Sequence, residues 1–145
     1  MAMLLSNKKR KIFYVSYLYE GRCNDMGILK EEFKPGKQWF KNLRVIFDLG
    51  FIGVDKLYEF KELVIGHKRP RKSEKNPNPE LTDEQKEKNK EISKERIYVE
   101  HAIGGMKRYR MLKNKARTKS YELKNQILGN CAGLWNYKLE INDYN

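Results

Sequence analysis

Three short apolar runs, separated by breaks that contain glycine, limit the folds open to this chain of 145 residues. Ile12–Tyr19 is dense in β-branched and aromatic side chains, whereas Leu43–Phe47 and Leu63–Ile65 are shorter runs that end near Gly50 and Gly66. Runs of this kind are typical of β-strands. Helical patterns lie between and after them, so the order of elements predicts an α/β fold with a small mixed sheet flanked by helices.

Two helices are marked by residues that suit helix ends. Asp25 is placed to cap a short helix ending at Phe33, because its carboxylate can accept the free amides of the first turn. Thr82 and Gln85 fit a capping box, which predicts that a long helix begins here and runs to about Met111. Its buried stripe would consist of four apolar residues at helical spacing, namely Ile92, Val99, Ile103 and Met106.

The remaining segments complete one partial domain over residues 1–145. A short helix is expected over residues 53–60, and residues 67–81 are expected to form a mobile basic loop because they contain three prolines and many charges. A closing helix is expected over residues 121–139. Its buried residues would be Leu123, Ile127, Cys131, Leu134 and Trp135.

The charge of the chain favours an anionic partner. Lysine and arginine number 31 against 19 acidic residues, which gives a formal net charge of +12. Residues 101–119 contain seven lysines and arginines and no acid, and residues 68–75 contain five against Glu74. Such patches bind phosphates by releasing counterions, so nucleic acid is favoured over an incidentally charged surface. No apolar run approaches the roughly 20 residues of a membrane-spanning helix, and the two cysteines lack a zinc-site spacing.

Asp48 follows the second predicted strand, in the sequence DLGFIG. Ligands collect at the carboxyl ends of strands in open α/β sheets, and the two glycines permit a tight turn beside the carboxylate. The simpler interpretation is an aspartate that only caps the turn after the strand. The local sequence leaves both interpretations open.

Glu100 lies on the long predicted helix and shares one face with Arg96, Gly104 and Lys107. Because that face adjoins the apolar stripe, Glu100 is expected to point toward the sheet rather than into bulk water. The alternative is an ordinary helical ion pair with Arg96, one turn away. Considered together, Asp48 and Glu100 suggest a site for hard divalent ions such as Mg²⁺, which prefer carboxylate oxygens.

Several segments resemble the DDE-type transposases of bacterial insertion sequences. VIFDLGFIGV is similar to the second-aspartate segment of that family, and ERIYVEHAIGGMKRYRML is similar to its glutamate segment. The glutamate segment carries Arg96, Glu100 and Lys107 at the family's typical spacing. IGHKRPRK and ILGNCAGLWNYKLE resemble the basic strand-end segment and the closing helix, so the resemblance covers about Ile12 to Leu139.

The resemblance implies an RNase H-like core that cleaves and joins DNA with two Mg²⁺ or Mn²⁺ ions held by two aspartates and a glutamate. Asp48 and Glu100 would be the catalytic metal ligands. The residues that would contact DNA are Arg96, Lys107, Lys68, Arg69, Arg108 and Arg110.

The family's first aspartate has no counterpart in this sequence, so the resemblance implies a truncated RNase H-like fold with little or no activity alone. The chain would be a remnant or the second half of a product completed by an upstream transposase segment. DNA and a second copy of the chain are the other expected partners, with no membrane and a cytoplasmic, nucleoid-associated location. The competing interpretation is a basic nucleic-acid-binding protein without enzymatic activity, which would need the positive charge but neither carboxylate.

Overall fold

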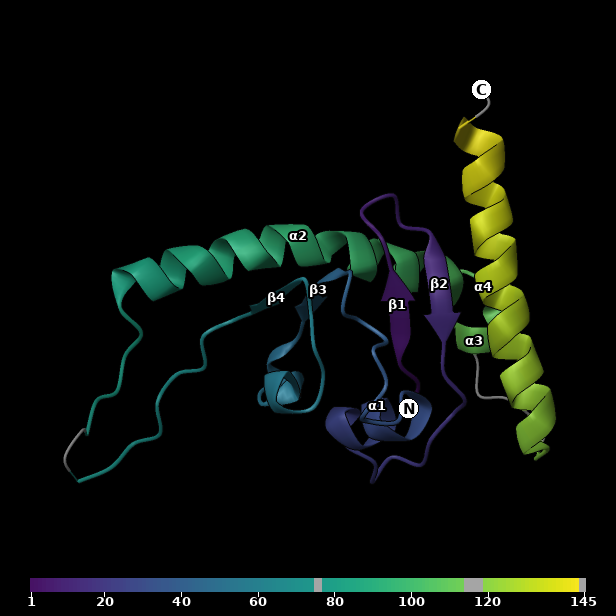
Figure 1. Cartoon of the computed structure of the whole chain (residues 1–145). Coiled ribbons are helices and arrows are strands. Elements are labelled where there is room, and N and C mark those ends of the chain that lie inside the picture. Colours follow the sequence, from purple (N-terminus) through teal and green to yellow (C-terminus); the bar gives the residue numbers. More distant parts are fainter. Residues whose placement is uncertain (75–76, 114–118, 144–145) are drawn as a thin grey trace. The chain divides into compact units, whose positions relative to one another are not determined.

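The computed structural model describes residues 1–74, 77–113 and 119–143, and their contacts divide the chain into two units. Met1–Cys23 and Ile97–Asn145 form the first unit, and Asn24–Arg96 form the second. The predicted α/β class with small sheets flanked by helices is confirmed, although the strands hydrogen-bond as two separate pairs instead of one mixed sheet. The helices and strands are β1 (Leu4–Ser6), β2 (Ile12–Val15), α1 (Asp25–Glu32), β3 (Arg44–Phe47), β4 (Glu62–Ile65), α2 (Asp83–Lys107), α3 (Arg110–Lys113) and α4 (Tyr121–Asp143) (Figure 1).

The first unit is built on an antiparallel hairpin of β1 and β2, in which Leu4 pairs with Val15 and Leu5 pairs with Tyr14. β2 ends at Val15 and is therefore shorter than the strand predicted over Ile12–Tyr19. β1 was not predicted, since three residues are too few to show an alternating pattern. Helix α4 packs against β2, and the Asn136 amide bonds both the backbone N–H and the carbonyl of Ile12.

The core of the first unit lies between the hairpin, the last turns of α2, and α4. Trp135 from α4 packs its ring against Gly105 of α2. Leu123 and Leu134 were predicted to be buried, but they are 44% and 51% exposed, because the buried face of α4 carries a different set of residues. The buried core of the unit consists of Ile12, Ala102, Met106, Leu128, Cys131, Ala132, Trp135 and Leu139.

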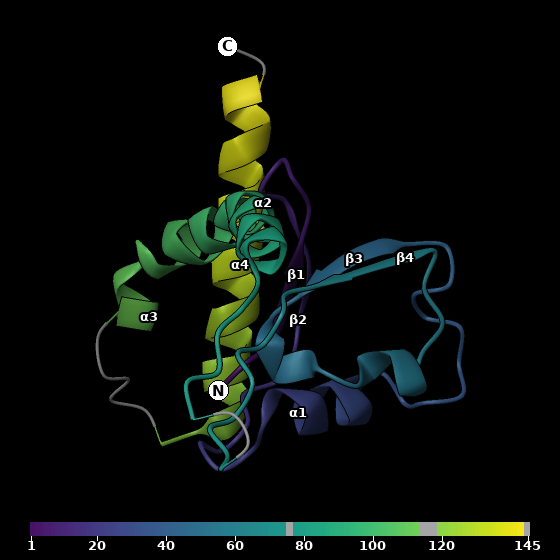
Figure 2. The ribbon, with the colours of Figure 1, turned by 90° about the vertical axis from the view of Figure 1, so that its left-hand side faces the viewer.

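The second unit contains β3 and β4, which pair in parallel from Arg44 opposite Glu62 to Phe47 opposite Ile65. Figure 2 shows the two strands side by side. Two short 3-10 helices follow β3, namely η1 (Leu49–Phe51) and η2 (Val54–Lys56). Only η2 falls within residues 53–60, where a longer helix was predicted. The core of this unit combines the fully buried aliphatic residues Ile28, Leu29 and Val54 with a network of aromatic rings. Its ring contacts join Phe33, Trp39, Phe40, Phe47, Phe51, Tyr58 and Phe60.

The helix ends agree with the sequence in one case and differ in two. The capping box is confirmed, because the Thr82 N–H donates to Gln85 Oε1 and the Gln85 N–H donates to Thr82 Oγ1. Helix α1 is capped by Asn24, whose side chain accepts from the Gly27 N–H, so the prediction of Asp25 as the cap was wrong by one residue. Helix α2 ends at Lys107, about a turn before the predicted end.

Burial along α2 differs from the predicted stripe. Met106 is buried as predicted, but Ile92, Val99 and Ile103 are only partly buried. The described residues of the 67–81 loop contain no helix, in agreement with the prediction of a loop. Arg69 Nε donates to the Pro79 carbonyl across this loop at 2.6 Å, whereas Lys75 lies outside the described residues.

Candidate functional site

The C-terminal end of β3 places the Asp48 carboxylate on the Arg96 guanidinium of helix α2. Arg96 Nη1 donates to Asp48 Oδ1 at 3.0 Å, and Arg96 Nη2 donates to Asp48 Oδ2 at 2.9 Å. Two parallel charge-assisted bonds fix the orientation of both groups more strongly than a single contact. The Asp48 side chain remains 52% exposed, so its oxygens are accessible to solvent. The structure therefore joins the aspartate of one predicted motif to the arginine of the other.

Asp48 also caps the 3-10 helix that follows β3. Its Oδ1 accepts the Leu49 N–H at 2.6 Å, which confirms the simpler interpretation of Asp48 as a turn cap. The cap and the pairing with Arg96 use the same carboxylate, so neither interpretation excludes the other. Close by, a Cβ atom on Gly50 would lie 2.7 Å from Asp25 Oδ2, so a larger residue there would require the Asp25 side chain to move.

Further contacts attach the first half of α2 to the β3–β4 sheet. Arg44 on β3 makes a bidentate bond with Glu95 at 2.9 Å and an ion pair with Glu62 at 3.0 Å. The hydrogen bonds to Glu95 and then to Glu62 raise the pKa of Arg44 still further above its ordinary value. One turn and a half earlier, the Asn89 side chain bonds both the N–H and the carbonyl of His67. The contacts of Glu95 with Arg44 and of Asn89 with His67 thus hold this part of α2 beside the strands, where Arg96 reaches Asp48.

Glu100 lies four residues after Arg96 in the same continuous helix, and it belongs to the first unit. Its side chain is exposed, which contradicts the expectation that it points away from bulk water. The Glu100 side chain makes no hydrogen bond or ion pair among the described residues, and Arg96 pairs with Asp48 instead. The predicted alternative of an Arg96–Glu100 ion pair is therefore wrong for this structure.

The other predicted DNA contacts are exposed and lie in two separate segments. Lys68 and Arg69 belong to the loop of the second unit. Lys107, Arg108 and Arg110 lie at the end of α2 and the start of α3 in the first unit. Each segment presents cations to solvent, as a phosphate-binding surface requires. Of the basic run over residues 101–119, Lys115 and Arg117 lie outside the described residues.

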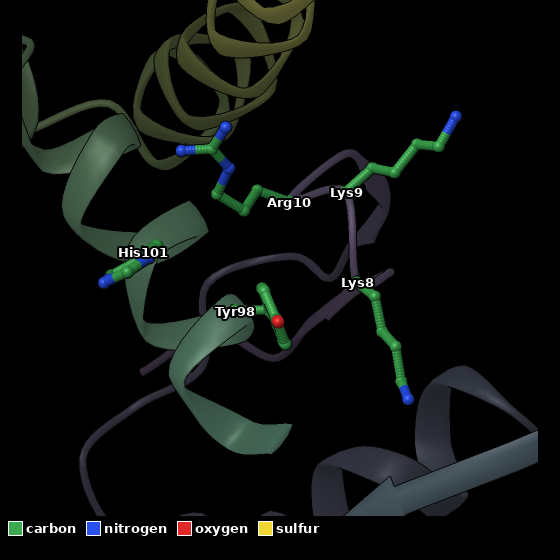
Figure 3. Close-up of a pocket in the computed structure, with 5 residues that line it drawn as sticks. All are labelled: Lys8, Lys9, Arg10, Tyr98 and His101. Carbon is green, nitrogen blue, oxygen red and sulfur yellow. The ribbon is translucent and has the colours of Figure 1, made fainter. Parts of the chain in front are cut away.

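A pocket of about 530 Å³ in the first unit was missed by the sequence reasoning. It is lined by Lys8, Lys9 and Arg10 of the β1–β2 turn and by Tyr98 and His101 of α2 (Figure 3). The only sequence feature that pointed to it was the run NKKRK at residues 7–11, which lies between two apolar segments and is typical of a basic turn.

The comparisons with known proteins decide the family. The model of the DDE superfamily endonuclease family matches residues 1–136. The chain belongs to this family. A curated relative, the probable transposase for insertion sequence element IS702 of Microchaete diplosiphon, is 31% identical over 124 residues. That match covers 84% of this chain, which spans 40% of the length of the relative. No solved structure matches the chain significantly.

DDE superfamily endonucleases generally use divalent metal ions, and the donor chemistry of the chain suits them. Asp48 and Glu100 both offer exposed carboxylate oxygens, and Mg²⁺ is commonly bound through one or two carboxylates together with water. No group of three His, Cys, Asp or Glu side chains gathers within the described ranges. Each of the two carboxylates therefore suits a divalent metal ion in its chemical type. Within the same ranges, no helix is long and apolar enough to cross a membrane.

Proposed function

We propose that the chain forms part of the catalytic domain of a DNA transposase, in which Asp48 and Glu100 hold divalent metal ions for phosphodiester cleavage. The observation that carries the proposal is the bidentate bond between Asp48 and Arg96. It joins the aspartate segment to the helix that bears Glu100 four residues later. The family match supports the same assignment, because both motifs lie within the matched residues.

The proposal assigns a separate role to each side chain. Asp48 and Glu100 would hold Mg²⁺ or Mn²⁺, and these ions, when bound, neutralise developing charge and help to generate the attacking oxygen. Asp48 is already oriented by the Leu49 N–H, so little freedom remains to be lost on binding. Arg96 balances the charge of Asp48 when DNA is absent. Its planar guanidinium matches a phosphate as well as a carboxylate, so Arg96 would turn to a DNA phosphate in the complex.

The exposed lysines and arginines would contact the phosphate backbone of the DNA. Lys107, Arg108 and Arg110 would contact the backbone from the end of α2, and Lys68 and Arg69 would contact it from the loop. The reaction would be hydrolysis at the end of the element, followed by attack of the freed 3′-hydroxyl on target DNA. An upstream transposase segment and a second copy of the chain are the proposed protein partners.

The test uses the chain expressed together with the segment encoded directly upstream of it. Nicking of element-end DNA should require Mg²⁺ or Mn²⁺ and should disappear in Glu100→Gln and Asp48→Asn. The matched control is Glu122→Gln, an exposed glutamate in the first turn of α4 that the proposal does not use. Nicking that is unchanged in Glu100→Gln would contradict the catalytic assignment and leave a basic nucleic-acid-binding protein.

A further inference from the structure

The pocket beside the β1–β2 turn has the composition of a site for a polyanion. Three of its five lining residues are lysine or arginine, the other two are tyrosine and histidine, and none is acidic. Its volume of about 530 Å³ lies within the usual range for small-molecule sites. None of the five residues was among the metal ligands or phosphate contacts assigned above, so the pocket requires a separate explanation.

The turn that carries the cations holds Arg10 in an unfavourable backbone conformation. The Asn7 carbonyl accepts the Arg10 N–H at 2.9 Å, and Asn7 Oδ1 accepts the Lys11 N–H at 3.0 Å. Within this turn Arg10 has a φ of 66°, in the left-handed region that glycine and asparagine adopt more easily. Such strain is commonly found at functional sites, where the side chain is needed despite its cost.

Trp135 fixes the position of the turn relative to helix α2. Its Nε1 donates to the Arg10 carbonyl at 2.9 Å, and its ring lies against Gly105 of α2. The same buried indole thus contacts the turn that carries Arg10 and the part of α2 that follows His101. Since Trp135 is only 7% exposed, its indole ties the backbone of the turn to the core of the first unit.

The side chains around the pocket suit a strand of phosphates better than a single phosphate. In Figure 3, the ends of Lys8, Lys9 and Arg10 point in three different directions from the turn. A single phosphate would draw cations to one point, whereas a nucleic-acid strand offers separated charges. The Tyr98 ring, 39% exposed, stands at the wall formed by α2, where an unpaired base can stack on it.

We propose that this pocket binds a single-stranded segment of DNA, with Arg10, Lys8 and Lys9 on successive phosphates and Tyr98 stacked on a base. The inference rests on the proposed function for its DNA substrate and adds a contact surface to it. A duplex buries its base faces by pairing, so the pocket should prefer a strand with unpaired bases.

The test measures binding without metal, by fluorescence anisotropy of a labelled dT20 strand, a blunt duplex and an rU20 strand. Arg10→Asn should leave the melting temperature unchanged or raised, because asparagine tolerates the left-handed conformation. It should also reduce the salt dependence of dT20 binding by about 0.7 in the slope of log K against log salt concentration. Lys9→Gln, which carries no backbone constraint, should weaken binding in the same way.

Tyr98→Leu should weaken dT20 binding by about fivefold or more while changing duplex binding little, as expected for the loss of one stacked base. The control variants are Lys138→Gln and Tyr137→Leu, two exposed residues of α4 outside the pocket. Equal losses in the pocket and control variants would overturn the proposal. Tighter binding to rU20 with the same dependence on Arg10 and Tyr98 would overturn the choice of DNA and assign RNA.

The two proposals fail in different ways. If metal-dependent nicking requires Glu100 but dT20 binding is indifferent to Arg10, Lys9 and Tyr98, the pocket assignment is wrong and the proposed function stands. If binding depends on these residues but nicking is insensitive to Glu100, the pocket is supported as a DNA site and the catalytic assignment fails. Absence of DNA binding by the unaltered chain would overturn the pocket proposal.

Discussion

Two adjacent glycines in helix α2 should respond to the same substitution in opposite directions. A Cβ atom on Gly105 would lie 2.3 to 2.4 Å from three atoms of the Trp135 ring, whereas a Cβ atom on Gly104 would meet no atom within 4 Å. Both residues are near the C-terminal end of the same helix, so the intrinsic benefit of alanine over glycine is shared. The difference between the two variants therefore isolates the contact with Trp135.

The size of the effect follows from the contact distance. Carbon atoms pack at about 3.5 to 4.0 Å, so the Trp135 ring would have to move by more than about 1 Å. The ring is buried and its Nε1 is bonded to the Arg10 carbonyl, which limits such movement. Overpacking of a core costs about 1 to 3 kcal/mol, and alanine restores up to about 1 kcal/mol of helix propensity. With the cost near the upper end, Gly105→Ala should lower the unfolding free energy by about 2 kcal/mol.

Gly104→Ala should instead raise the unfolding free energy by about 0.5 to 1 kcal/mol. Urea denaturation followed by circular dichroism measures both variants, and the slope with denaturant should be unchanged if only packing differs. The melting temperature should fall by about 6 °C in Gly105→Ala, at about 3 °C per kcal/mol for a chain of this size. Equal stabilities of the two variants would refute the close packing of Trp135 on α2.

Three further predictions concern other contacts. Asn136→Ala should lower the unfolding free energy by about 2 kcal/mol, because it removes two hydrogen bonds to the Ile12 backbone. Urea denaturation measures the change, and a loss under about 0.5 kcal/mol would contradict this role of Asn136. Burial raises the pKa of Tyr58 in the folded chain, because the buried site disfavours the charged phenolate. The neutral Tyr58 hydroxyl therefore adds to the free energy of unfolding below pH 10, and this stabilisation is lost as the pH rises through the raised pKa. Stability should therefore fall above pH 10, and Tyr58→Phe should flatten that fall; an identical slope in both proteins would argue against it. Asp48→Asn should cost less than about 1 kcal/mol in chemical denaturation, because its ion pair with Arg96 is half exposed; a larger loss would make Asp48 primarily a structural residue.

Short-range patterns were the features that the sequence predicted best. The capping box of Thr82 and Gln85 depends on residues three apart, and the structure contains both of its hydrogen bonds. β3 and β4 were found within one residue because each is a compact apolar run next to a glycine turn. The cap of α1 was misplaced because Asn24 and Asp25 are both good capping residues, and only the backbone conformation distinguishes them.

Contacts between residues far apart in the chain could not be predicted from the sequence. The bond between Asp48 and Arg96 joins residues 48 positions apart, whereas the sequence suggested DNA and the helical neighbour Glu100 as partners for Arg96. The faces of α4 were misjudged for a similar reason. Leu134 and Trp135 are both apolar, and the register of packing against the hairpin decides that Trp135 is buried and Leu134 is exposed.

The pocket beside the basic turn at residues 8–11 could not be recognised from charge counts along the sequence. The charge counts drew attention to residues 68–75 and 101–119, where lysine and arginine are most numerous. The turn has fewer cations, but the hairpin and the Trp135 indole bring them beside Tyr98 and His101. The proximity of the turn to Tyr98 and His101 depends on packing within the first unit, so no short sequence pattern could predict it.

The most direct test of the catalytic proposal is a Mn²⁺ titration of the isotope-labelled chain followed by nuclear magnetic resonance. Bound Mn²⁺ broadens the signals of nearby residues, so the amides around Asp48 and those around Glu100 report independently on the same ion. The proposal predicts that both sets broaden with one midpoint and that Asp48→Asn abolishes the broadening at both. Broadening around one carboxylate alone, or around Glu100 undiminished in Asp48→Asn, would contradict a shared metal site.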